Sequence, residues 1–304
     1  MQYPAYLNLS DEEFEERIAK AYAVLEDCEV CPRHCHINRR KGEFGYCGTL
    51  EDPSVTSHHP HFGEEPPLVG RYGSGTIFMA SCNLACVYCQ NYEISQMCAG
   101  ETVTVEQFAG MMLELQARRC HNVNIVTPSI WVPQIIKGVY EARKGGLRVP
   151  LVYNTSSYDE LRSLKLLDGI ADIYMPDAKY ASEKLARKYS LVSHYPSIMK
   201  AAIKEMHRQV GDLVVEDGVA KRGLLVRHLV LPKDIAGSEE ILDWLKEEIS
   251  ANTLVNVMEQ YTPYWKAQRY PEIARPVASE EYLRAVEHAR ALGLRILNRF
   301  STAP

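Results

Sequence analysis

Residues 76–91 read TIFMASCNLACVYCQN, a short apolar run followed at once by three cysteines. The run at 76–80 predicts a strand buried on both faces, because its apolar residues are continuous rather than alternating. In parallel α/β folds the functional site lies where strands end at their carboxyl side, and the loop carrying Cys82, Cys86 and Cys89 begins there. This stretch therefore predicts an α/β fold with its site at the end of the first parallel strand.

Downstream of this stretch, short apolar runs alternate with helical patterns, which is typical of βα units around a parallel sheet. We count six such units, and right-handed crossovers would curl them into an open barrel. The sequence therefore predicts a partial (β/α)6 TIM-like barrel over residues 71–304, preceded over residues 1–70 by an amino-terminal helix and a cysteine-rich metal-binding extension. The predicted strands are 76–80, 123–126, 151–153, 170–175, 224–231 and 254–258, with a last strand-like run at 294–297. The main predicted helices are 105–118, 133–144, 158–167, 195–210, 238–249 and 279–292.

Composition excludes several classes of protein. The chain has 304 residues, 46% of them hydrophobic and 24% charged, which is enough apolar mass for a sizeable core. The formal charge is −5 and there is no polybasic run, so we do not expect nucleic acid as a partner. No run of 18 apolar residues is present and the first 25 residues are acidic, so we expect neither a membrane span nor a secretory signal. These features predict a cytoplasmic protein.

The cysteines are bunched in a way that favours metal binding over disulfides. The chain has nine, and seven of them fall in two tight clusters. In the second cluster, three thiolates at C-x3-C-x2-C spacing can hold three irons of a [4Fe-4S] cube and leave the fourth iron open. An open position is typical of a metal site that does chemistry. The alternative is a closed site whose fourth ligand is Cys98 or Cys120.

The first cluster, Cys28, Cys31, Cys35 and Cys47, supplies four thiolates within an irregular segment that is poor in apolar residues. Four cysteines suit either a structural zinc ion or an auxiliary iron–sulfur cluster. Metal binding there would supply folding free energy to a segment that otherwise lacks a core. We therefore predict a second metal site, and leave zinc and iron–sulfur both open.

The histidines of the extension lie near these cysteines and prolines. His34 and His36 are expected to be exposed neighbours of the first cluster. His58, His59 and His61 form a local group, for which a surface position is the ordinary expectation and a substrate or metal role the alternative.

The cysteine triad, with Tyr88 before its last cysteine and on a loop after the first strand of a partial barrel, resembles the radical S-adenosylmethionine superfamily. Within it, residues 82–95 are similar to the pyruvate formate-lyase activating-enzyme-like branch, and the chain from Cys28 to the last helix resembles the PflX-type proteins. The motifs that carry this likeness further are 31–33 (CPR), 45–47 (GYC), 62–66 (FGEEP), 126–128 (VTP), 153–155 (YNT), 173–180 (IYMPDAKY) and 227–232 (RHLVLP).

The resemblance implies an anaerobic oxidoreductase chemistry. The open iron would chelate the amino and carboxylate groups of S-adenosylmethionine, and one electron from the reduced cluster would cleave the cofactor to methionine and a 5′-deoxyadenosyl radical. That radical would abstract a hydrogen atom from the substrate. The protein would hold the reacting atoms together and keep solvent away.

The resemblance also implies partners. The electron would come from a donor such as flavodoxin or ferredoxin, and the substrate would be either a glycine Cα–H of a glycyl radical enzyme or a small molecule or peptide. The rival class is a non-enzymatic iron–sulfur electron-transfer protein, which would have two closed metal sites and no response to S-adenosylmethionine.

The resemblance further implies which residues meet the cofactor. Positions that end the third and fourth strands would gather near its carboxylate, some of them around a monovalent cation. Alternation points Asp177 and Lys179 to the same side, with a simple salt bridge at a strand end as the alternative. Many relatives carry Gly-Gly-Glu where this chain has VTPS, so Thr127 alone is offered there, and of Arg227 and His228 we favour Arg227 for the interior. The candidate cofactor-binding residues are Tyr88, Asn91, Thr127, Asn154, Thr155, Met175, Asp177, Lys179, Arg227 and Gln260.

Overall fold

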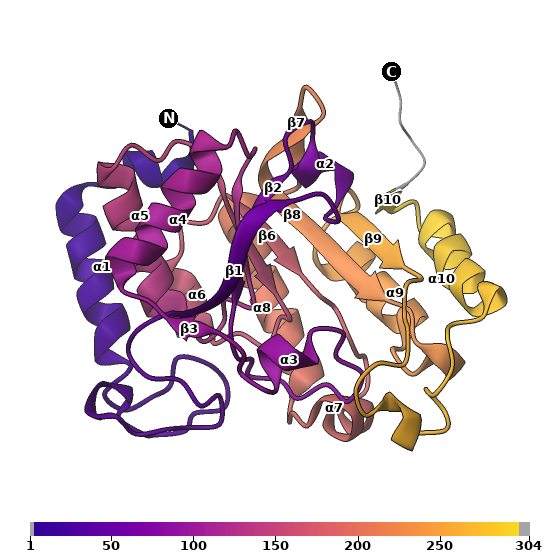
Figure 1. Ribbon diagram of the computed structural model, residues 1–304. Coiled ribbons are helices and arrows are strands. Elements are labelled where there is room, and N and C mark those ends of the chain that lie inside the picture. Colours follow the sequence, from indigo (N-terminus) through magenta and orange to yellow (C-terminus); the bar gives the residue numbers. More distant parts are fainter. Residues whose placement is uncertain (1–2, 298–304) are drawn as a thin grey trace.

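A curved, mostly parallel sheet with helices on its outer face forms the body of the protein, as seen in a computed structural model that describes residues 3–297 (Figure 1). The predicted α/β partial barrel is therefore confirmed. Residues 1–2 and 298–304, the outer ends of the two predicted domains, lie outside the described residues. The parallel strands, in spatial order, are β2 (Ser74–Met79), β4 (Val123–Val126), β5 (Leu151–Thr155), β6 (Ile173–Pro176), β8 (Val219–Leu229), β9 (Leu254–Met258) and β10 (Arg295–Ile296).

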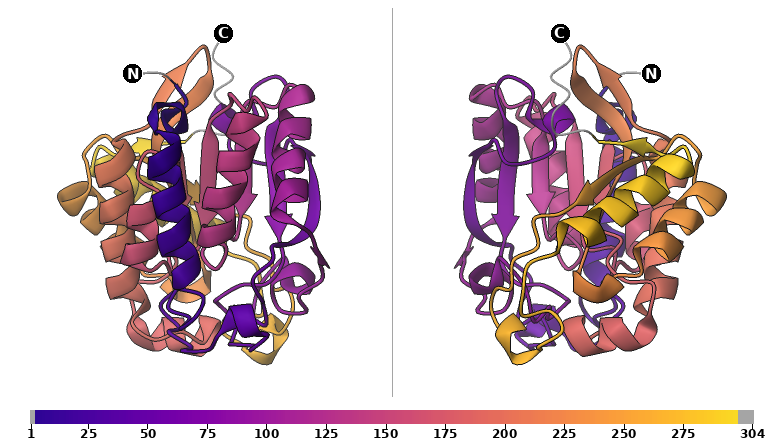
Figure 2. Two further views of the ribbon diagram at one scale, coloured as in Figure 1. Left: turned by 90° about the vertical axis from the view of Figure 1, so that its left-hand side faces the viewer. Right: turned by 90° about the vertical axis from the view of Figure 1, so that its right-hand side faces the viewer.

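Helices connect these strands in the order that right-handed βα units require. In Figure 2, α1 lies in front of the sheet in the left view and α10 in the right view, so helices cover the outside of the sheet from both directions. Along the strand order, β1 and β9 lie toward opposite edges of the sheet. None of the helices in the described part of the chain is long and apolar enough to cross a membrane. The α-helices are α1 (Asp11–Ala23), α2 (Pro66–Val69), α3 (Tyr92–Ser95), α4 (Val105–Ala117), α5 (Val132–Lys144), α6 (Leu161–Leu166), α7 (Glu183–Ser190), α8 (Tyr195–Val210), α9 (Ser238–Glu248) and α10 (Ser279–Ala291).

One strand lies in the segment expected to be irregular. β1 (Ser54–His61) pairs antiparallel with β2 across the predicted boundary at residue 70, and β3 (Glu101–Thr102) pairs with β1 at the edge. β1 is rich in Ser and His and has few apolar residues, so neither a continuous apolar run nor a hydrophobic alternation marks it. Its backbone pairing with β2, rather than its composition, places it in the sheet. A short strand β7 (Val214–Glu216) forms a hairpin with β8.

The register of the parallel strands decides which side chains point inward. Arg227 on β8 lies beside Asn256 on β9, and Asn154 on β5 lies beside Met175 on β6. A small apolar cluster on this inner face includes Val152, Ile173, Leu225 and Leu254 and is separate from the larger core under the helices; α2 adds Leu68 to it. The inner face is thus apolar near the amino ends of the strands and polar further along.

Asp172 joins the amino-terminal segment to the sheet. Its carboxylate accepts the Ala5 N–H at 2.7 Å and the Leu151 N–H at 3.0 Å. Burial raises the pKa of this carboxyl from 3.8 to about 7, because two neutral amides offset only part of the cost of burying a charge. The folded protein therefore keeps a proton between these pH values that the unfolded chain releases, and the stability from this group is lost as the pH rises towards 7.

We expect Asp172→Asn to flatten that dependence. Asparagine stays neutral at every pH, so the free energy of unfolding of the variant should fall less than that of the unmodified protein between about pH 5 and about pH 8. Chemical denaturation at both pH values measures this difference. Parallel pH profiles for the two proteins would contradict the raised pKa.

Candidate active site

The cysteine loop follows β2 at the carboxyl end of the sheet and is held there by backbone hydrogen bonds. The Ser81 N–H donates to Ile94 O at 2.9 Å, and the N–H groups of Ala85 and Val87 donate to carbonyls at the end of α7 at 3.0 and 2.8 Å. Ser81 has a φ of 67°, so the chain turns sharply as it leaves the strand. The loop therefore follows β2, as the sequence predicts, and lies against α7, a helix that the sequence analysis did not predict.

Each of the three thiols in the loop has its own hydrogen-bond partner. The Leu84 N–H donates to Cys82 Sγ at 3.3 Å, Cys86 Sγ lies 3.0 Å from Ser190 Oγ, and Cys89 Sγ lies 3.1 Å from Ser95 Oγ. Burial raises the pKa of Cys86 to about 11, against the opposing charge of Lys179. Hydrogen bonds to thiolate sulfurs are a usual way for proteins to stabilise and tune iron–sulfur clusters.

The sulfur donor set of the triad fits an iron–sulfur cluster. In the part of the chain that is described, no three His, Cys, Asp or Glu side chains converge as ligands of one ion. In a cube each thiolate binds a different iron, so the sulfurs of the triad need not converge on one atom. Cys98 is exposed and lines a different cavity, together with Ser81 and Trp131, and Cys120 lies beside Gly75 at the opposite end of β2.

A cavity of about 270 Å³ opens between this loop and the carboxyl ends of β6, β8 and β9. Its size is near the lower end, about 300 Å³, of ordinary ligand pockets. Six of the candidate cofactor-binding residues line it. The lining residues are Cys86, Tyr88, Cys89, Gln90, Asn91, Asp177, Lys179, Arg227, Leu229, Met258, Gln260, Tyr261, Thr262 and Tyr264.

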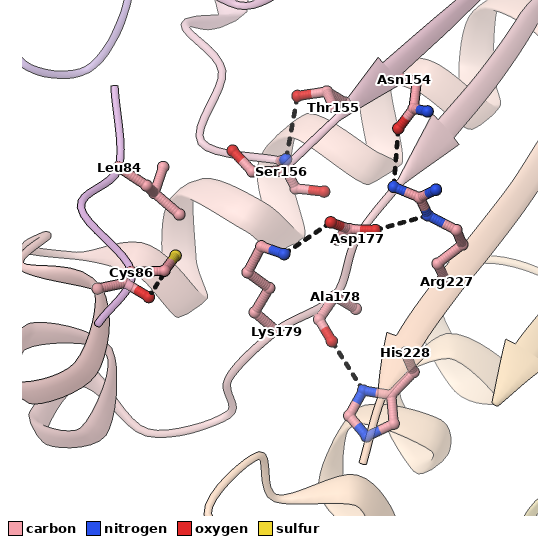
Figure 3. A network of polar contacts seen from close by, with 12 residues as sticks. Leu84, Cys86, Asn154, Thr155, Ser156, Asp177, Ala178, Lys179, Arg227 and His228 are labelled. Atoms are coloured by element: carbon pink, nitrogen blue, oxygen red, sulfur yellow. Dashed lines mark hydrogen bonds and ion pairs between the residues drawn. The ribbon is translucent and has the colours of Figure 1, made fainter. Parts of the chain in front are cut away.

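A buried ionic network forms one wall of the cavity (Figure 3). The Asp177 carboxylate lies between two cations, accepting from Lys179 Nζ at 2.6 Å and from Arg227 Nε at 2.7 Å. Arg227 Nη2 also donates to Asn154 Oδ1 at 2.7 Å. Burial opposes ionisation of Asp177, but the two cations outweigh it and hold its pKa below the usual value. Each carboxylate oxygen thus already has one cationic partner, so a monovalent cation at Asp177 would meet two positive charges.

The register of β8 shows which of Arg227 and His228 faces the interior. Arg227 faces the interior, as predicted, whereas His228 points outward, where its ring lies 2.7 Å from Ala178 O and 2.8 Å from Ser238 Oγ. Burial lowers the pKa of His228, so this ring is a neutral structural contact.

Tyr88 joins the wall of the cavity to a network of buried hydroxyl groups. Its ring lines the cavity and packs edge-on against Tyr261, with ring centres 5.6 Å apart. Its hydroxyl lies 2.6 Å from that of Tyr180, which lies 2.9 Å from Ser190 Oγ. A chain of hydroxyl groups therefore links the aromatic wall of the cavity to the serine beside Cys86.

Four candidates do not line the cavity, and one of them, Asn154, reaches it only through its hydrogen bond to Arg227. The Thr155 hydroxyl donates to Asp159 Oδ2 at 2.6 Å and lies 3.0 Å from Ser129 Oγ, so it is engaged in a buried network. Met175 is fully buried in the inner apolar cluster. Thr127 has a φ of 62°, a strained backbone conformation for a residue other than glycine. Its N–H donates to Asn154 O at 3.1 Å, so the backbone of Thr127 meets the site.

Several residues of the site carry no sequence signal that we used. Ser190 is 104 positions from Cys86 and stands in a helix of ordinary composition. Leu229 and Met258 could have been found, because each lies two residues beyond an inward-facing residue of its strand and so points the same way.

The four cysteines of the amino-terminal segment line a second, narrow cavity of about 10 Å³. The Tyr46 N–H donates to Cys35 Sγ at 3.4 Å, and Cys47 Sγ lies 3.1 Å from Thr49 Oγ1. Asn83, the residue after Cys82, also lines this cavity, and its carbonyl accepts from Arg33 Nε at 2.8 Å. The two cysteine clusters are therefore neighbours, joined through the loop of the triad.

Comparison with known proteins finds one relative that matches most of the chain and another that matches part of it. No family model matches it. The uncharacterized protein MJ0674 of Methanocaldococcus jannaschii is 31% identical over 290 residues, covering 92% of this chain and 79% of its own length. The uncharacterized protein MJ0808 of the same organism is 27% identical over 210 residues, covering 58% of this chain and 62% of its own length.

Among solved structures, methylornithine synthase (PylB) aligns with a TM-score of 0.47 at 13% identity, over 98% of this chain and 82% of that one. The FeFe-hydrogenase maturase HydG from Carboxydothermus hydrogenoformans aligns with a TM-score of 0.48 at 11% identity, over 95% of this chain and 58% of that one. Identity of 31% across most of both chains establishes kinship with the archaeal protein: this chain belongs to the same family as the uncharacterized protein MJ0674 of Methanocaldococcus jannaschii.

Proposed function

We propose that this protein is a radical S-adenosylmethionine enzyme whose Cys82, Cys86 and Cys89 hold a [4Fe-4S] cluster. The observation that carries the proposal is the position of the triad, on a loop at the carboxyl end of the first parallel strand, where Cys86 and Cys89 line a cavity with an ionic wall. The resemblance of the triad motif to this superfamily supports it independently. When bound and reduced, such a cluster supplies the electron that cleaves S-adenosylmethionine to a 5′-deoxyadenosyl radical.

The residues of the cavity have distinct tasks in this proposal. Lys179 and Arg227 present positive charge to the carboxylate of the cofactor, and the Tyr88 ring offers an apolar surface to its adenine. Leu229 and Met258 line the cavity beyond the charged wall and exclude water from the reacting atoms. Ser190 holds Cys86 in place by the hydrogen bond to its sulfur.

The direct test is anaerobic. We expect the protein reconstituted with iron and sulfide to give a reduced-cluster paramagnetic resonance signal that shifts on addition of S-adenosylmethionine. We also expect 5′-deoxyadenosine to accumulate, slowly when no substrate is present, as measured by chromatography. A fully occupied cluster with neither response would instead favour an iron–sulfur electron carrier.

The finer assignments are extensions of this proposal. The PflX-type motifs favour the pyruvate formate-lyase activating-enzyme-like branch, with flavodoxin or ferredoxin as reductant. The substrate would be either a glycine of a partner enzyme or a small molecule or peptide. A glycyl radical partner would give a doublet in the paramagnetic resonance spectrum when mixed with the reduced enzyme and cofactor, and a small substrate would transfer deuterium into 5′-deoxyadenosine.

We further propose that Cys28, Cys31, Cys35 and Cys47 hold one zinc ion. Their cavity of about 10 Å³ has room for about one water-sized body, and a four-iron cube is much larger. No three of these thiols converge as ligands of one ion in the described structure, so binding would draw the sulfurs inward. The ion would then also fix the neighbouring Cys82 loop through Arg33 and Asn83.

Metal analysis of a protein with serine at Cys82, Cys86 and Cys89 tests this assignment. We expect the iron bound by the triad to be lost and about one zinc per chain to remain at the amino-terminal cysteines. Four irons per chain surviving the substitution would show that the second site holds an iron–sulfur cluster. A protein that retains neither metal would contradict a second metal site.

A further inference from the structure

A second polar layer lies on the inner face of the barrel, between the cavity and α2. The chain leaves β1, and residues 62–66 bring Glu64 and Glu65 into the interior before α2 begins. α2 lies at the end of the barrel opposite α3 and α7 (Figure 1), and its Leu68 packs on Val152 and Ile173. These two glutamates therefore lie between the inner apolar cluster, to which Leu68 of α2 belongs, and the ionic wall of the cavity.

Glu65 has a buried carboxylate oxygen without a hydrogen-bond partner. The residue is 5% exposed, and its Oε1 accepts from Asn256 Nδ2 at 2.9 Å. Its Oε2 is buried and accepts no hydrogen bond from any described residue. Leaving such an oxygen unpaired is costly, and an isolated buried charge costs more still. The arrangement is typical of a site that receives a donor from outside the chain.

Glu64 adds negative charge beside it. Its Oε2 lies 3.8 Å from Arg227 Nη1, but the other two nitrogens of that guanidinium are already committed to Asp177 and Asn154. Burial raises the pKa of Glu64 to about 7, with Arg227 opposing and Glu65 adding to the rise. Asp177, Glu64 and Glu65 thus share two cations, Arg227 and Lys179, with Glu64 partly protonated near pH 7.

The opposite wall does not balance this charge. His59 and His61 of β1 pack on Phe78 of β2, with ring centres 5.5 and 5.7 Å apart. Burial lowers the pKa of His61, so its ring is neutral near pH 7. The His61 ring on this wall therefore adds no fixed positive charge near pH 7.

Asn124 is an independent sign of an unfilled polar site. It lies on β4 in register with Val152, on the inner face, and is fully buried. Neither its Oδ1 nor its Nδ2 has a hydrogen-bond partner among the described residues. Two residues earlier on the same face, Asn122 donates to Leu68 O of α2 at 2.9 Å. The Asn124 amide, whose oxygen and nitrogen both lack a described partner, therefore lies on the face of the sheet that α2 covers. Glu65 directly precedes α2.

We propose that Glu64 and Glu65 bind a positively charged nitrogen of the substrate, a primary ammonium or a guanidinium group. A donor of this kind satisfies Glu65 Oε2 and neutralises the excess carboxylate, while the body of the substrate extends past Arg227 into the cavity. A metal cation is the poorer match, because Glu64 and Glu65 offer fewer oxygen ligands than Ca²⁺ or Mg²⁺ requires. The inference rests on the proposed function, since it takes the cavity above as the site of the reacting cofactor.

The test uses the reconstituted full chain with its cluster oxidised, with and without S-adenosylmethionine. Isothermal titration with n-butylammonium, n-butylguanidinium and neutral n-butylurea compares probes of similar size. We expect at least one cation to bind at least about tenfold more tightly than the urea. Glu65→Gln, and separately Glu64→Gln, should remove that preference by weakening the cation about tenfold or more while leaving the urea unchanged.

The matched control is Glu248→Gln, which alters an exposed carboxylate on α9 paired with Lys204 and should keep the preference. Equal affinity for cations and urea, or a preference that survives both glutamine variants, would overturn the proposal. Assay of 5′-deoxyadenosine on the same samples separates the two hypotheses. Product formed without cation preference rejects the cation site alone, whereas cation preference without any product rejects the radical chemistry.

Discussion

Cys86→Ser is expected to abolish both cluster binding and 5′-deoxyadenosine formation. Cys86 lies in the middle of the triad, is buried, and its sulfur faces Ser190 rather than solvent. A serine hydroxyl stays protonated near neutral pH and is a poor ligand for iron, so the cube would keep only two thiolates. Iron content and chromatography of the reduced protein with S-adenosylmethionine measure the two losses, and we expect both to reach the detection limit.

Cys98→Ser is the matched control for this experiment. Cys98 is exposed and does not line the cavity of the triad. The same chemical change should therefore leave iron content and 5′-deoxyadenosine formation at the level of the unmodified protein. If instead Cys98→Ser loses its iron, the triad is part of a closed four-thiolate site, and the proposal of an open iron fails.

Asp177→Ala is expected to lower both the stability of the protein and its affinity for S-adenosylmethionine. Its carboxylate is the shared partner of Arg227 and Lys179, whose side chains are only 18% and 17% exposed. Removing one partner from a buried ionic network leaves the others uncompensated and costs about 3–5 kcal/mol. The free energy of unfolding, measured by chemical denaturation, should fall by about this amount. The affinity for S-adenosylmethionine should fall as well, because the two cations lose the group that orients them.

Two further variants separate charge from shape. Asp177→Asn keeps the volume and one acceptor oxygen, so we expect a smaller loss of stability than with alanine. Glu248→Gln breaks an exposed ion pair with Lys204 and should have no measurable effect on unfolding. Equal stability of Asp177→Ala and the unmodified protein would mean that water compensates the two cations, and the network would then have no structural weight.

The strands and the cysteine loop were predictable because their signals are local. Continuous apolar runs mark β2, β4, β5, β6, β8 and β9, and the period of two along β8 is enough to turn Arg227 inward and His228 outward. β1 was missed because its residues are mostly polar and its place comes from backbone pairing with an existing edge. Pairing with β2, rather than the residue pattern of β1 itself, makes β1 a strand.

The candidate site divides in the same way. Spacing alone brought Cys82, Cys86 and Cys89 together and placed Asp177 and Lys179 on one side of a strand end. Spacing could not indicate that Thr155 is engaged by Asp159, that Asp177 is shared between two cations, or that Ser190 meets Cys86. These contacts join residues from different elements, and their partners are chosen by how the elements pack.

By itself, the sequence determined the βα order, the triad at the end of the first strand and the inward parity of the strand residues, because periodicity and short spacing act within a few residues of chain. Only the tertiary structure decided that Glu64 turns toward Arg227 and Glu65 toward Asn256, and that Glu65 keeps a buried oxygen without a partner among the described residues. The physical reason is that burial and charge balance depend on everything that surrounds a group. Asn256, which meets Glu65, lies 191 residues away along the chain, and no local pattern records that approach.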